Sequence, residues 1–143
     1  MRHEYFDTTG AALRPPEWRI VTMLRDAQDP DALWHDLSRR IGPTRADQAL
    51  AGFSRFMNLL RTYGWHTPLT LCPGARSVSE DERALARFVL HCAEQDHDSA
   101  TAEAMMLVAP QAILPLVAAG ERLGLPLLCE ECRERARCPL TFQ

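Results

Sequence analysis

The chain contains 143 residues, of which 46% are hydrophobic, and this size and composition are typical of one globular domain. Its formal net charge of −3 excludes a strongly basic protein drawn by overall charge to nucleic acid or an anionic membrane, so nucleic acid stays possible only through local patches. No apolar run approaches the roughly twenty residues that span a bilayer, and the N-terminus lacks the apolar region of a secretion signal. We therefore expect a cytoplasmic protein without a membrane segment.

The first part of the chain predicts two amphipathic helices. We expect residues 1–14 to form a flexible segment ahead of a single helical domain over residues 15–143, with a cysteine-rich C-terminal end. Apolar residues recur at helical spacing over residues 17–27. A second helix is expected within residues 29–42, where an aspartate can act as N-cap, a proline fills the first helical position and a glycine ends the helix.

The third predicted helix has the clearest periodicity in the chain. Thr44 can cap it, and Gly64 ends it. A loop with few periodic residues then covers residues 65–78. The apolar stripe that defines this helix consists of Leu50, Phe53, Phe56, Met57 and Leu60.

A capping box opens the fourth predicted helix, because Ser79 and Glu82 have the spacing that this motif requires. Ser99 can cap a further helix over residues 100–108. The apolar stretch over residues 110–124 is interrupted by proline and glycine, so we expect a kinked helix or a later start there. Since no segment alternates as a strand does, the predicted class is all-α, with one compact domain of about six or seven short helices.

Three cysteines with C-x2-C-x5-C spacing, Cys129, Cys132 and Cys138, stand near the C-terminal end, and Pro139 follows them. Intracellular thiols are kept reduced, so this spacing indicates a metal or iron–sulfur centre rather than disulfides. On a straight helix Cys138 would lie opposite Cys129, so the helix must end before Cys138 if all three bind one centre. Cys92, on the apolar face of the fourth predicted helix, is expected to be a small core residue.

A complete centre of this kind needs a fourth ligand. Cys72 is the preferred candidate, because it lies in a loop and precedes a proline, whose fixed φ helps to shape turns around sulfur. His66 is the alternative fourth ligand and would favour zinc. The cofactor that we expect is a [4Fe–4S] cluster, with zinc as the alternative. The predicted ligands are Cys72, Cys129, Cys132 and Cys138.

The spacing from Cys129 to Pro139 resembles that of the last three ligands in the [4Fe–4S] loops of helix-hairpin-helix DNA glycosylases and of AddB-type nucleases. In these nucleases the first cysteine lies far upstream, which is the position that Cys72 would take. The resemblance implies the type of cluster and not the activity. Arg122 stands where the glycosylases have their first cysteine, and the chain shows neither a nuclease carboxylate–lysine motif nor a hairpin with a catalytic lysine.

Motifs for catalysis are weak. A redox-active pair of Cys129 and Cys132 is an alternative to metal binding, but thioredoxin-type chemistry normally comes with a βαβ unit, for which the sequence gives no sign. We find no Gly-rich phosphate loop, serine nucleophile elbow or HExxH motif. The sequence therefore favours a protein that is not an enzyme.

We expect a small bacterial metal- or iron–sulfur-binding protein with a regulatory or accessory role that responds to redox state, iron or oxygen. The bacterial origin rests on the basic residues, all of which are arginine, as in high-GC genomes. The alternative is a helical protein–protein interaction module or transcriptional regulator with structural zinc or incidental thiols. A protein partner or a homodimer is expected, and the apolar run at residues 105–108 is the candidate for self-association.

Overall fold

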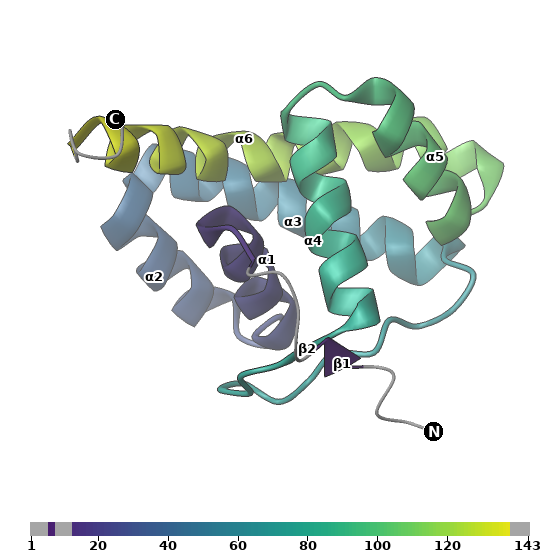
Figure 1. Cartoon of the computed structure of the whole chain (residues 1–143), viewed down its shortest axis with the longest axis horizontal. Coiled ribbons are helices and arrows are strands. Elements are labelled where there is room, and N and C mark those ends of the chain that lie inside the picture. The colour runs from purple at the N-terminus through teal and green to yellow at the C-terminus, as the bar shows by residue number, and fades with distance from the viewer. Residues whose placement is uncertain (1–5, 8–12, 138–143) are drawn as a thin grey trace.

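Two long helices, α3 (Pro43–Tyr63) and α6 (Ile113–Arg137), lie against each other and form the axis of the fold (Figure 1). The computed structural model describes residues 6–7 and 13–137. The predicted all-α class with one compact domain is confirmed, but α6 is one long helix where we expected shorter ones. The helices that pack around this axis are α1 (Pro15–Arg25), α2 (Pro30–Ile41), α4 (Glu80–Ala93) and α5 (His97–Leu107).

Local capping signals set two helix starts where the sequence predicts them. The Asp29 carboxylate accepts a hydrogen bond from the N–H of Ala32 at 3.2 Å and begins α2. At the start of α4, the Ser79 hydroxyl accepts from the N–H of Glu82, and the Glu82 carboxylate accepts from the N–H of Ser79, both at 3.0 Å. This reciprocal pair is the expected capping box.

Two other predicted starts are wrong by a few residues. α3 begins at Pro43 and not after a cap at Thr44, because proline suits the first helical position, where no N–H is needed. α5 begins at His97, because the Asp96 carboxylate accepts a hydrogen bond from the N–H of Ser99 at 3.2 Å and so acts as the N-cap. A short 3₁₀ turn then precedes α6.

A pair of two-residue antiparallel strands, β1 (Phe6–Asp7) and β2 (Val78–Ser79), was not expected. Strands this short show no alternation of polar and apolar residues, so periodicity carries no signal for them. The pairing sets residues that precede α1 beside the start of α4.

Two prolines lie within α6. Pro115 falls in the first turn, where its missing N–H matters little, whereas Pro126 lies inside the helix and removes one backbone hydrogen bond. The helical stretch Pro110–Arg133 also has the length and composition of a membrane span, because an 18-residue window within it has a mean hydropathy of 1.5. Half of that apolar window is buried inside the domain, and the core helix of a globular protein meets the same criterion.

Glycines allow α6 to pass close to its neighbours. A Cβ atom at Gly52 of α3 would lie 2.6 Å from the backbone nitrogen of Leu123, and a Cβ at Gly124 would lie 3.0 Å from a side-chain carbon of Val89 in α4. Both distances are too short for an unstrained contact. Small residues therefore bring α3, α4 and α6 together around one apolar core.

Candidate functional site

The two C-terminal cysteines that the structure describes lie on the outer face of α6. Cys129 and Cys132 are one helical turn apart, and both are exposed to solvent. Cys138, the third predicted ligand of this group, lies outside the described residues. The cysteine-rich segment thus presents a pair of thiols on one face of a helix.

The two glutamates between these cysteines point toward α1. Glu130 accepts hydrogen bonds from Arg19 Nη2 at 3.2 Å to each carboxylate oxygen. Glu131, which is only 9% exposed, accepts from Arg14 Nη2 at 2.6 Å and from Arg14 Nε at 3.3 Å. Charge-assisted bonds of this kind are among the stronger polar contacts. They fix the rotation of α6 about its axis and leave the thiols on the solvent side.

A buried ion pair holds the loop that carries Cys72. Arg25, at the end of α1, donates to the two oxygens of the Glu82 carboxylate at 2.8 and 3.0 Å. The same guanidinium donates to the backbone carbonyls of Ala75 and Ser77 at 2.9 and 2.8 Å. The loop is therefore fastened to α1 and α4 near Cys72, whose thiol is exposed.

The environment of Glu82 keeps its carboxylate ionised. Burial alone raises the pKa of this carboxyl, but hydrogen bonds from Arg25 and from the N–H groups of Ser79 and Leu71 act in the opposite direction and prevail. The pKa of Glu82 is therefore lowered. This carboxylate organises the loop and is not available as a proton acceptor for a substrate.

Opposite ends of α1 hold the two segments that carry the predicted ligands. Its C-terminal end holds the Cys72 loop through Arg25, whereas its N-terminal end holds the segment with the α6 cysteines through Arg14. Residues 14 and 25 lie about 16 Å apart along a helix. Among the described residues, no three His, Cys, Asp or Glu side chains could hold a metal ion together. The four-ligand centre, which includes Cys138, stays a prediction, and the described part does not bring Cys72 to the α6 pair.

Two further residues are His66, the alternative fourth ligand, and Cys92, the cysteine expected in the core. His66 Nε2 lies 3.8 Å from a carboxylate oxygen of Asp81, on the exposed side of the loop. Cys92 is 1% exposed, which confirms its expected place in the core. Burial, with a smaller contribution from the charges of Glu103 and Glu121, raises the pKa of Cys92 to about 12. Its thiol is therefore protonated at neutral pH.

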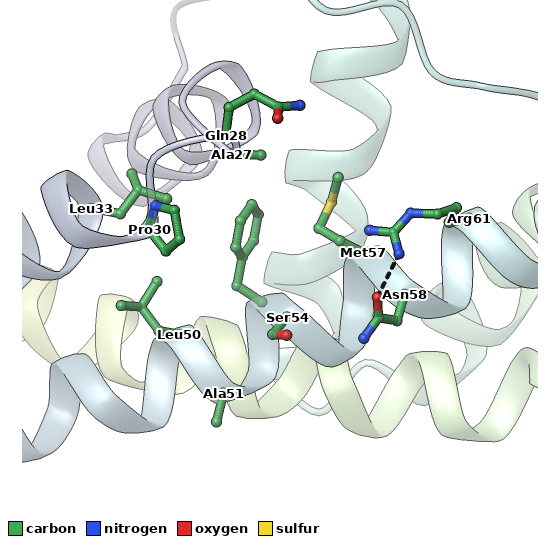
Figure 2. A pocket seen from close by; sticks show the side chains of 11 residues that line it. Ala27, Gln28, Pro30, Leu33, Leu50, Ala51, Ser54, Met57, Asn58 and Arg61 are labelled. Carbon is green, nitrogen blue, oxygen red and sulfur yellow. Dashed lines mark hydrogen bonds between the residues drawn. The ribbon is translucent and has the colours of Figure 1, made fainter.

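A groove of about 600 Å³ runs between α3 and the turn that joins α1 to α2 (Figure 2). Leu50 and Met57 project from α3 toward this groove, and Pro30 and Leu33 of α2 lie opposite Leu50. Phe53, which is almost fully buried, lines the groove between them. We call this surface the α3 groove.

The α3 groove continues toward the end of α3. A second hollow of about 410 Å³ shares Met57 and Arg61 with it and is bordered by Trp65. Trp65 is 59% exposed, and its indole N–H donates to the backbone carbonyl of Met105 at 3.2 Å. The apolar surface thus extends from the α1–α2 turn to an exposed tryptophan.

The apolar run predicted for self-association is divided between surface and core. Met105 and Met106 are 58% and 75% exposed, whereas Val108 is buried, because it forms a β-bridge with Gly64 and packs inside. Only the methionine half of this run is accessible to a partner. It lies beside Trp65 at the end of the α3 groove.

No known protein family, characterised protein or solved structure matches this chain. The sequence places Leu50 and Met57 in the apolar stripe of the third predicted helix but does not show that both stay half-buried and line the α3 groove. The exposed Trp65, in a loop without helical periodicity, was the signal available.

Proposed function

We propose that this protein is a helical interaction module that binds an amphipathic helix of a partner protein in the α3 groove. The observation that supports this proposal most is the joined pair of hollows along α3, which share Met57 and Arg61. Pockets for small molecules are usually enclosed clefts, whereas amphipathic helices lie in long, open apolar grooves.

The dimensions of the α3 groove suit a short helix. The lining of the two hollows extends from Leu50 of α3 to Gly64, the residue after this helix, which corresponds to about 21 Å. A partner helix of about fourteen residues covers that length. Apolar residues at i, i+3, i+4 and i+7 of such a helix would rest on Leu50, Phe53 and Met57.

The positive charge of Arg61 favours a partner helix that carries an acidic residue. Arg61 lines both hollows, is exposed, and donates to the Asn58 side-chain carbonyl at 2.8 Å. Within the described residues it forms no salt bridge with a carboxylate. An acidic residue beside the apolar stripe of the partner would pair with this guanidinium.

The test first identifies the partner by crosslinking and then measures the affinity of the partner peptide for the α3 groove. A photo-crosslinking amino acid at Ser54, an exposed residue of the groove, would identify the partner segment in the native host, and a synthetic peptide of that segment would then be titrated calorimetrically. Met57→Glu and Arg61→Glu should each weaken binding by about tenfold or more, or about 1.4 kcal/mol. The matched variants Thr62→Glu and Arg55→Glu change exposed α3 residues outside the groove and should bind as the wild type does.

Two results contradict this proposal. A captured peptide that binds Met57→Glu as tightly as the wild-type chain does not occupy the groove. A peptide that binds without a gain of helicity in circular dichroism is not a helix in its bound state.

A second candidate function uses the C-terminal thiols. A metal-dependent regulatory or accessory protein, with zinc or an iron–sulfur cluster at these cysteines, is favoured by the exposure of Cys129 and Cys132 on one face of α6. The inward-pointing pairs of Glu130 and Glu131 support it, because they hold both thiols outward.

A further inference from the structure

The outer face of α6 carries a stripe of exposed residues. Their spacing alternates between four and three positions, which is the spacing of the seam residues in a coiled coil. The opposite side of α6 is buried against α3 and α4, so this stripe is the face that remains for another helix. The stripe consists of Ala118, Arg122, Leu125, Cys129 and Cys132.

The two thiols of this stripe point in a fixed direction, and within the described residues they offer a metal ion only two ligands. Arg14 and Arg19 hold the intervening glutamates against α1, so Cys129 and Cys132 cannot turn inward without breaking these pairs. Two thiolates one helical turn apart can bind the same ion. In the part of the chain that the structure describes, no third metal-binding side chain joins them.

We propose that Cys129 and Cys132 of two copies of this chain bind one zinc ion between them. Structural zinc is four-coordinate and tetrahedral, and a twofold axis through the ion doubles a pair of thiolates into the required four. Within the described residues one copy offers two of the four ligands, and a second copy completes the site. The inference shares no residue with the α3 groove, and it gives the second candidate function a specific site.

Charge on this face agrees with a metal-bridged dimer. Arg45 and Arg122 line a hollow of about 300 Å³ beside Cys129, so two metal-free copies would bring like charges together. A zinc ion with four thiolates has a net charge of −2. The arginines of both copies would then surround a negative centre, and their repulsion would become attraction.

The size of the stripe makes the dimer dependent on the metal. Stable interfaces bury about 1,200 Å² or more, whereas this single helix stripe offers Leu125 as its chief apolar residue. Zinc–sulfur bonds supply the missing free energy. Each thiol releases its proton to the solvent as its sulfur binds the ion, so acid weakens the dimer by competing for the thiolates.

The experiment uses the full chain, reduced and stripped of metal with a chelator. Zinc is added in steps while light scattering measures the molar mass and a colorimetric dye measures the bound metal. The mass should double when one zinc ion is bound for every two chains. Cobalt in place of zinc should give the absorption spectrum of a tetrahedral thiolate site.

Cysteine variants separate this site from the other possibilities. Cys129→Ser and Cys132→Ser should lose both the metal and the dimer, with unchanged helicity in circular dichroism. Cys72→Ser and Cys138→Ser should retain both. The proposal is overturned if a monomer binds one zinc per chain, if Cys72→Ser or Cys138→Ser abolishes binding, or if Cys129→Ser binds zinc as the wild type does. Iron with acid-labile sulfide in protein purified without oxygen would also overturn it. None of these outcomes affects the α3 groove.

Discussion

Glu82 shows how one buried charge organises a loop that has little apolar content. Its carboxylate is fully buried, pairs with Arg25 and accepts N–H groups from both sides of the loop. A buried ion pair adds less than its contacts suggest, because both charges lose water, but removal of one partner leaves the other uncompensated. The largest effect of Glu82 on stability is therefore expected on its removal, which would leave the buried charge of Arg25 uncompensated.

The pH dependence of stability reports on this residue. The pKa of Glu82 is lower in the folded chain than in the unfolded chain, so its stabilising contribution is present above the unfolded pKa and is lost as pH falls through the folded value. Glu82→Gln should reduce the free energy of unfolding by about 3 kcal/mol at neutral pH. Between about pH 5 and pH 3 it should lose less further stability than the wild type does.

Urea unfolding at several pH values measures this difference. Glu80→Gln changes an exposed carboxylate two positions away and serves as the control, because the buried ion pair with Arg25 is formed by Glu82. Parallel pH profiles for wild type and Glu82→Gln would contradict the assignment.

At the level of elements, the packing of α3 on α6 depends on Gly52. A Cβ at this position would meet backbone atoms of Leu123 and Arg122, which cannot move as a side chain can. Gly52→Ala gains helix propensity of about 1 kcal/mol but overpacks the contact, so we expect a net loss of about 2 kcal/mol in stability. Thermal or denaturant unfolding measures it.

Gly120 provides the comparison for this prediction. A Cβ at Gly120 would lie 2.8 Å from the sulfur of Cys92, so the clash is with the end of a side chain. Gly120→Ala should be tolerated better in a Cys92→Ala background, whereas Gly52→Ala should not be rescued there. A Gly52→Ala chain as stable as wild type would mean that the two helices are not in close contact.

The sequence predicts where some helices begin, but it does not predict how their side chains are oriented in the fold. The starts of α2 and α4 are set by capping side chains within four residues, so they can be predicted locally. The outward direction of Cys129 could not, because it depends on pairs between α6 and Arg14 or Arg19, more than a hundred positions away. The α3 groove likewise arises where α2 leaves part of a long apolar stripe uncovered.

For the molecule as a whole, Cys92 can report global unfolding. It is buried between α4 and α6, and its raised pKa keeps the thiol in its unreactive form. In a chain where Cys92 is the sole cysteine, reaction with a thiol reagent should be slower than that of a sole Cys72 by about a thousandfold or more. The rate should rise with urea in parallel with unfolding followed by circular dichroism, and rapid reaction in native buffer would contradict the closed core.

The bond between Arg14 and Glu131 joins residues that are 117 positions apart. Between these two residues the backbone therefore runs almost in a closed ring. The position of the chain ends in such a ring is arbitrary. A circularly permuted chain, with a short linker across this contact and new ends at the exposed bend near Gly74, would keep every helix beside the same neighbours. The architecture is defined by the cyclic order of its helices, and neither α1 nor α6 has to be the first or the last.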